Sequence, residues 1–174
     1  HTRWNCDWSS DVCSSDLDKK PIRLSALARQ IVSEFLNNGL DERFILEIEV
    51  LDENAQVNGD ERLLTRAVNN LIQNSINHNP DGCCIQLLTS FNGINNTCSF
   101  IMADNGKGIS QNELPDLLEL PFSSKRKHRR KNGHGLGLPM VARIAGAHQG
   151  RLFLYSDIGK GFRAEIVLPS IKHD

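Results

Sequence analysis

Apolar residues recur every three to four positions in three long stretches of the chain, which predicts three amphipathic helices. These helices cover residues 24–38, 60–78 and 136–148. Asp60 has the position and the side chain of an N-cap for the second of them. A shorter helix is predicted around residues 112–118, inside a loop-rich region.

Alternating apolar and polar residues predict strands between these helices. Residues 43–51 form the first strand, residues 84–91 and 97–103 form a hairpin around an Asn-Gly-rich turn, and residues 151–155 and 163–168 form the last two. This order of elements favours an α+β fold, a two-layer sandwich in which about three helices cover one face of a mixed, mostly antiparallel sheet. It does not favour a doubly wound parallel sheet.

Residues 1–17 show neither the helical nor the strand spacing of apolar residues, and their two Trp and two Cys are unlike the composition downstream. The stretch DWSSDVCSSDL, residues 7–17, is similar to the translation of a common sequencing adapter. We therefore expect residues 1–17 to be a non-native leader outside the fold. Residues 18–174 are expected to form a single ATP-binding catalytic domain, for the reasons given below.

Composition narrows the class of protein. The 174 residues are 39% hydrophobic and carry a net charge of −1, which fits one globular domain without a broad basic face for nucleic acid. No apolar stretch approaches the ~20 residues needed to cross a bilayer. The five cysteines show neither zinc-site spacing nor a secreted disulfide framework, so a reduced, cytoplasmic setting is expected. Membrane anchoring of the parent protein is left open.

Four polar residues of the second predicted helix lie along one stripe of its surface: Asn70, Asn74, Asn77 and His78. Carboxamide oxygens one turn apart can both face Mg²⁺ when phosphates and water complete its octahedron. A solvated polar face with a C-terminal cap is the alternative interpretation.

Asp104 follows an apolar strand and precedes two glycines in the sequence DNGKGI, residues 104–109. The carboxylate could accept a hydrogen bond from the exocyclic amine of adenine, and the glycines allow a close approach of the backbone. A simple turn would use the same residue types.

A third motif, GHGLGL at residues 133–138, opens the last predicted helix. Glycines leave backbone N–H groups free to bind phosphate oxygens, and the helix N-terminus adds its positive end. The dinucleotide-binding fingerprint is a rival, but its glycines have another spacing and directly follow a first strand. The cationic run at residues 125–131 precedes this motif and could contact phosphates, or it could be a solvated charge run.

The order of these motifs resembles that of histidine kinase catalytic domains, within the superfamily that also holds DNA gyrase, the Hsp90 chaperones and the MutL proteins. Residues 70–75 look like the N box, residues 104–108 and 133–138 like the two glycine boxes, and Pro121-Phe122 like the phenylalanine box. The resemblance spans residues 21–169.

The resemblance implies a Bergerat ATP-binding fold that holds ATP and Mg²⁺. Asn70 and Asn74 would be the catalytic pair that coordinates Mg²⁺ and, through it, the phosphates. Asp104 would recognise adenine, and His78 would lie near the base or cap the helix. The other nucleotide-binding residues that it implies are Asn77, Gly106, Gly108, Ile109, Lys125, Gly133, His134, Gly135, Leu136, Gly137 and Leu138.

The chain departs from the family pattern at several positions. Ser75 replaces a usual Ala, Asn77 replaces a Lys of many members, and Phe162 stands where Thr is common. Gyrase and MutL proteins carry a general-base Glu at the position of Arg66. Because an Arg cannot act as that base, phosphoryl transfer to a partner is favoured over hydrolysis of ATP, unless Arg66 is simply a surface residue.

None of the six histidines has the context of a phospho-acceptor, which would be a helical hairpin with an acidic neighbour. The expected partners are therefore a dimerisation and phospho-acceptor domain outside this chain and a response regulator. Two alternatives stay open: a serine kinase of the anti-sigma-factor type, and a non-catalytic ATP-binding module.

Overall fold

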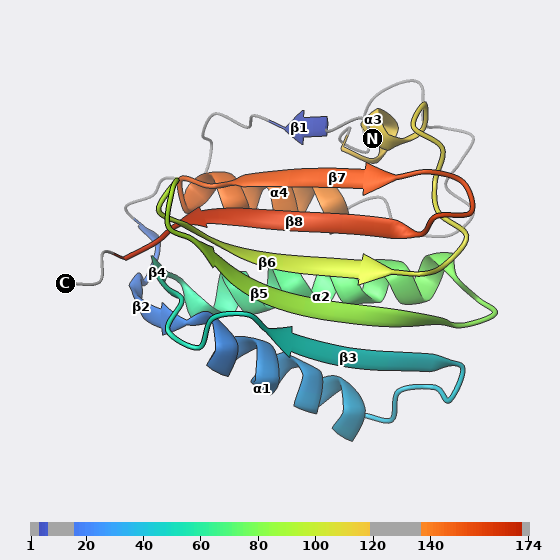
Figure 1. Ribbon diagram of the computed structural model, residues 1–174, viewed down its shortest axis with the longest axis horizontal. Coiled ribbons are helices and arrows are strands. Elements are labelled where there is room, and N and C mark those ends of the chain that lie inside the picture. The colour runs from blue at the N-terminus through green and yellow to red at the C-terminus, as the bar shows by residue number, and fades with distance from the viewer. Residues whose placement is uncertain (1–3, 7–15, 119–136, 172–174) are drawn as a thin grey trace.

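The computed structural model describes residues 4–6, 16–118 and 137–171, and for residues 4–6 it describes the backbone alone. Figure 1 shows a sheet with a layer of helices on one of its faces. In chain order the elements are β1 (Trp4–Cys6), β2 (Lys20–Arg23), α1 (Leu24–Asn37), β3 (Phe44–Val50), β4 (Gln56–Gly59), α2 (Glu61–His78), β5 (Cys83–Asn92), β6 (Thr97–Asp104), α3 (Leu114–Leu117), α4 (Gly137–Ala147), β7 (Arg151–Ser156) and β8 (Phe162–Pro169).

The large sheet has the strand order β1-β7-β8-β6-β5-β3. Neighbouring strands run antiparallel except β3 and β5, which run parallel. Parallel neighbours need a crossover connection, and here the crossover contains α2. The predicted α+β sandwich with a mixed, mostly antiparallel sheet is therefore confirmed.

The core lies between the sheet and the three long helices α1, α2 and α4 (Figure 1). Each helix turns an apolar stripe inward, as its periodicity predicted. Burial of one such side chain contributes about 1.5–3 kcal/mol. The largest fully buried side chains of the helices and of the sheet are Leu24, Ile31, Leu64, Leu71, Ile72, Ile85, Leu87, Phe100, Met102, Leu152 and Leu154.

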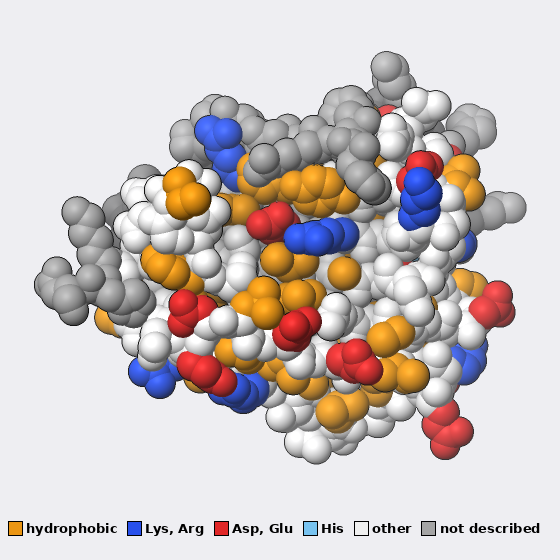
Figure 2. Space-filling view, viewed as in Figure 1, with side chains coloured by type: hydrophobic (Ala, Val, Ile, Leu, Met, Phe, Trp, Pro, Cys, Tyr) orange, Lys and Arg blue, Asp and Glu red, His pale blue; other side chains and the backbone are white. Residues whose placement is uncertain are grey.

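The opposite face of the sheet mixes apolar side chains with acidic and basic ones, as Figure 2 shows. Strand β3 illustrates why: Phe44 and Leu46 are buried, whereas Ile45 and Glu47 between and after them are exposed. A strand in a sheet with one packed and one open face has this alternation.

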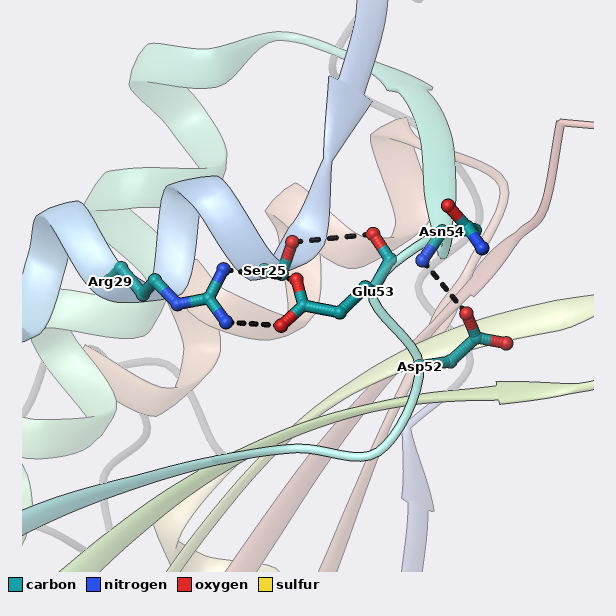
Figure 3. Close-up of polar contacts among 5 residues, drawn as sticks. All are labelled: Ser25, Arg29, Asp52, Glu53 and Asn54. Carbon is teal, nitrogen blue, oxygen red and sulfur yellow. Dashed lines mark hydrogen bonds and ion pairs between the residues drawn. The ribbon is translucent and has the colours of Figure 1, made fainter.

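A second, two-stranded sheet pairs β2 with β4, and the sequence pattern did not predict it. Both strands have four residues, and Pro21 in β2 lacks a backbone donor, so the strand signal is weak. The loop before β4 is held to α1, as Figure 3 shows. There Arg29 forms a two-pronged ion pair with Glu53, whose carbonyl oxygen accepts a hydrogen bond from Ser25 Oγ at 3.4 Å.

Strand β1 pairs antiparallel with β7, with Asn5 opposite Phe153. These three residues belong to the leader that was expected to lie outside the fold, so the structure differs from that expectation at β1. The foreign origin of residues 1–17 stays a prediction. None of the described helices combines the length and the apolar character that crossing a bilayer requires.

Candidate functional site

A pocket lies where the end of α2 meets the loop after β6 and the start of β8. Five of the residues that line it are predicted site residues: Asn74, His78, Asp104, Gly108 and Ile109. Four others line it that were not predicted as site residues: Ser75, Asn79, Lys107 and Phe162.

Asp104 ends β6, and the residue is 9% exposed. Oδ1 accepts hydrogen bonds from the backbone N–H groups of Gly106 at 2.9 Å and Phe162 at 3.2 Å. Oδ2 accepts a hydrogen bond from the hydroxyl of Ser75. Three donors from three segments thus orient a buried acceptor, which satisfies the polar group and fixes its direction.

Asn79 joins the end of α2 to the glycine-containing loop. Its Nδ2 donates to the carbonyl oxygen of Ser75 at 2.8 Å, and its Oδ1 accepts from the backbone N–H of Lys107 at 3.1 Å. A Cβ atom at position 106 would lie 2.0 Å from Asn79 Oδ1, so the loop can approach this side chain only with Gly106.

The same loop interlocks with the turn between β7 and β8. Ser156 Oγ accepts from the backbone N–H of Ile109 at 2.8 Å and donates to the carbonyl oxygen of Gly161 at 2.6 Å. Gly108 has a φ of +72°, and a Cβ atom there would lie 2.0 Å from the carbonyl oxygen of Asp157. Both the backbone conformation and the space therefore require glycine at position 108.

The other residues of the predicted asparagine stripe lie outside this pocket in the described part of the chain. Asn77 Oδ1 accepts a hydrogen bond from Gln73 Nε2 at 3.1 Å on the exposed side of α2. Asn70 lies one turn before Asn74, and its Nδ2 is buried without a hydrogen-bond partner among the described residues. Because an unpaired buried amide costs free energy, a ligand would have a reason to bind there.

The start of α4 faces this part of α2. His148, directly after α4, accepts a hydrogen bond at Nε2 from the backbone N–H of Asp60, directly before α2, at 3.0 Å. The two helices therefore run antiparallel, and Gly137 and Leu138 at the start of α4 lie toward the later turns of α2. The residues predicted for the phenylalanine box, the cationic run and the start of the second glycine box lie outside the described residues. They are Pro121, Phe122, Lys125, Gly133, His134, Gly135 and Leu136.

The described residues hold no cluster of three or more His, Cys, Asp or Glu side chains that could bind a metal ion. A Mg²⁺ ion at Asn70 and Asn74 would therefore take most of its ligands from phosphates and water. Amide oxygens are suitable ligands for that hard cation. The buried unpaired atom of Asn70 is its Nδ2, a donor that could bond to a phosphate oxygen but could not coordinate the ion. The donor set thus fits Mg²⁺ only together with a phosphorylated ligand.

Cys83 lies near the pocket but is unsuited to nucleophilic chemistry. Burial, together with the charges of Asp104 and Cys84, raises the pKa of the Cys83 thiol to about 11. The thiol therefore stays protonated at neutral pH, and a thiolate is what nucleophilic attack requires.

Sequence reasoning missed Ser75, Asn79, Lys107, Phe162 and Ser156 as parts of the site. Ser75 and Phe162 carried a signal, because both depart from the family pattern that the sequence otherwise resembles. Asn79 was interpreted only as the stop of the second helix, and Ser156 lies just past the strand predicted over residues 151–155. Their contacts to the loop cross 28 and 47 positions of sequence, and no local pattern shows such contacts.

Comparison with known families identifies the class. Residues 59–172 match the family of histidine kinase-, DNA gyrase B- and HSP90-like ATPases, and the chain belongs to this family. Within it, the chain is a histidine kinase catalytic domain, since its curated relatives are sensor kinases and it covers only their catalytic part.

Two of these relatives are sporulation kinase C of Bacillus subtilis and the alginate biosynthesis sensor protein KinB of Pseudomonas aeruginosa. The first is 29% identical over 86% of this chain and 34% of its own length. The second is 31% identical over 82% of this chain and 23% of its own length. The chain thus spans about a third or less of these relatives.

Solved structures share the fold. The mycobacterial sensor histidine kinase MprB superposes with a TM-score of 0.71 at 23% identity, over 89% of this chain and 99% of that chain. Full-length ShkA, in complex with AMPPNP, superposes with a TM-score of 0.77 at 20% identity, over 92% of this chain and 33% of that chain.

Proposed function

We propose that this chain binds Mg-ATP and donates the γ-phosphoryl group to a histidine on a separate dimerisation domain, as part of two-component signal transduction. The observation that carries the proposal is the carboxylate of Asp104, held in a pocket by donors from α2, the glycine-containing loop and β8. An oriented, buried acceptor of this kind suits a ligand edge that donates a hydrogen bond, such as the amino group of adenine.

In this proposal, one set of residues binds the adenine base and another binds Mg²⁺ and the phosphates. Asp104 accepts from the adenine amine, and Gly106 and Gly108 keep the loop close to the base. Asn70 and Asn74 orient Mg²⁺, which, when bound, neutralises phosphate charge in phosphoryl transfer. Gly137, at the start of α4, belongs to the proposed phosphate-binding part, with the predicted residues that precede it: Lys125, Gly133, His134, Gly135 and Leu136.

Kinase activity is proposed over hydrolysis because of Arg66. This residue lies one turn before Asn70 on α2 and is exposed. A guanidinium stays protonated and cannot take a proton from water, so the chain has no general base at this position. Positioning and charge stabilisation then serve transfer to an acceptor side chain.

The proposed partners are the phospho-acceptor domain and a response regulator. A homologous fold, the histidine kinase ThkA, has been solved in complex with the response regulator protein TrrA. That likeness supports the idea of a similar partner for the parent protein of this chain. The proposed location of this domain is the cytoplasm, where ATP is available.

Calorimetric titration of the chain with ATP, with and without Mg²⁺, tests the pocket. We expect Asp104→Asn to abolish binding, because an amide brings an NH₂ group to a position surrounded by donors. We expect Asn74→Ala to weaken binding only when Mg²⁺ is present. Asn95→Ala, in the exposed turn between β5 and β6, is the matched control and should titrate like the wild type. Unchanged titrations of both site variants would contradict the proposal.

Labelled ATP separates kinase from hydrolase. The chain alone should release inorganic phosphate no faster than a sample without protein. When it is joined to a histidine phospho-acceptor domain, acid-labile label should appear on histidine. Steady release of phosphate by the chain alone would favour a hydrolase.

A further inference from the structure

Ser75 follows Asn74 on α2 and points into the protein at the edge of the candidate pocket. It is 2% exposed, and its hydroxyl oxygen lies within hydrogen-bond reach of Asp104 Oδ2 and 3.2 Å from Met102 Sδ. A hydroxyl has one hydrogen to donate, and a carboxylate is a much stronger acceptor than a thioether. The hydrogen therefore goes to Asp104.

The two oxygens of Asp104 are held in different ways. Oδ1 accepts from two backbone N–H groups, those of Gly106 and Phe162, which no side-chain substitution removes. Oδ2 accepts from Ser75, the one side-chain donor to this carboxylate among the described residues. The Cβ–Cγ torsion of an Asp is intrinsically broad, so removal of one of these donors frees the plane of the carboxylate to turn.

Two neighbours of the carboxylate do not donate to it from their side chains. Phe162, at the start of β8, contributes only its backbone N–H, because its side chain has no polar atom. The side chain of Asn79 bonds instead to Ser75 O and to Lys107 N. Among the described residues, the hydroxyl of Ser75 is thus the side-chain group that orients Asp104 Oδ2.

We propose that Ser75 is a positioning residue that orients Asp104 toward the 6-amino group of a purine, so that the preference of the pocket for ATP depends on this hydroxyl. The inference rests on the proposed function, since it concerns the base of the same nucleotide. It goes further, because it assigns base selectivity to a pair of side chains rather than to Asp104 alone.

The test compares ATP with purine riboside triphosphate, which lacks the 6-amino group, by calorimetric titration of the whole chain in the presence of Mg²⁺. A hydrogen bond to a charged acceptor corresponds to roughly 10- to 100-fold in affinity, so the wild type should prefer ATP by about that factor. In Ser75→Ala, we expect the affinity for ATP to fall and that for the analogue to stay the same. The preference should then shrink to within a few-fold.

Two further variants keep the result interpretable. Ser75→Cys has a similar size and a weak donor, so it should show an intermediate preference even if Ser75→Ala folds poorly. Ser25→Ala removes an equally buried hydroxyl from α1, remote from the pocket, and should keep the full preference. An equal loss of affinity for both nucleotides in Ser75→Ala, or an unchanged preference, would overturn the inference but not the proposed function. Failure of the wild type to bind ATP would instead overturn the proposed function, and this inference with it.

Discussion

The hydrogen bonds of the buried His148 side chain allow only one protonation state. It is 4% exposed, and its Nδ1 lies 2.7 Å from the carbonyl oxygen of Ile144, which can only accept. Nδ1 therefore carries the hydrogen, and Nε2 is free to accept from the backbone N–H of Asp60. The imidazole is neutral in this arrangement, because a second N–H would face another donor.

Stability of the fold should consequently fall in mildly acidic solution. Burial, with a smaller contribution from Lys19, lowers the pKa of His148 below its usual value of about 6.5, although Ile144 and Asp60 oppose the shift. The unfolded chain then binds a proton at a higher pH than the folded chain does. The contribution of neutral His148 to the unfolding free energy is complete above about pH 6.5. It is lost as the pH falls toward the folded-state pKa, at up to about 1.4 kcal/mol per pH unit.

Urea denaturation at pH 7.5 and pH 5.5 measures this loss. His148→Gln is the informative variant, because its amide oxygen can accept from Asp60 N without titrating. The wild type should lose more unfolding free energy between the two values than His148→Gln does. Equal losses would show that other groups are responsible. The carboxylates with lowered pKa values, Asp41 and Glu53 among them, titrate below this range.

At the candidate site, prediction from sequence worked where the signal is local. Asp104, Gly106 and Gly108 were predicted because a strand end, a carboxylate and two glycines are adjacent in sequence. Ser75 and Asn79 were not, because their roles come from contacts to residues 29 and 28 positions away. Burial against a partner strand or loop is a tertiary property that helix periodicity does not contain.

The first turn of α2 depends on a single cap. Asp60 Oδ1 accepts from the backbone N–H groups of Arg62 at 3.1 Å and Leu63 at 3.3 Å, and Oδ2 accepts from that of Asp18 at 3.2 Å. Asp60 is 4% exposed, and removal of its carboxylate would take the acceptor from all three donors.

Asp60→Ala should therefore lower the unfolding free energy by about 1–2 kcal/mol, the usual cost of losing an N-cap, and slightly more if Asp18 loses its acceptor as well. Asp60→Asn retains an acceptor oxygen and should cost less. Chemical denaturation monitored by circular dichroism measures both. A loss for Asp60→Asn as large as that for Asp60→Ala would show that charge, rather than capping, is what matters here.

Among the elements, the long helices were predicted to within one or two residues because their apolar stripes are continuous. The helix predicted over residues 24–38 is α1, Leu24–Asn37, and the one over residues 60–78 is α2, Glu61–His78. Strands β2 and β4 were missed because four residues are too few for a period of two to show. Their pairing is stabilised by partners distant in sequence, including a bridge between Val57 and Ser170.

For the whole molecule, the segment before residue 18 contributes one edge strand. β7 pairs with β1 on one side and with β8 on the other, and the pairing with β8 runs from Arg151–Val167 to Ser156–Phe162. The inner face of β7 is packed with Leu152 and Leu154 in the core. The position of β7 is thus determined by β8 and by the core, whereas β1 adds a three-residue ladder at the margin.

Deletion of residues 1–15 should therefore leave the fold and the affinity for ATP unchanged, with a change in unfolding free energy of less than about 1 kcal/mol. The deletion retains Asp18, whose backbone N–H bonds to the cap Asp60, so the start of α2 is preserved. Replacement of residues 4–6 by Gly-Ser-Gly in the full-length chain is the matched control, because it removes strand propensity but keeps the chain length. Loss of cooperative unfolding in both variants would mean that β1 completes the sheet, and residues 1–17 could then no longer be regarded as a leader foreign to the domain.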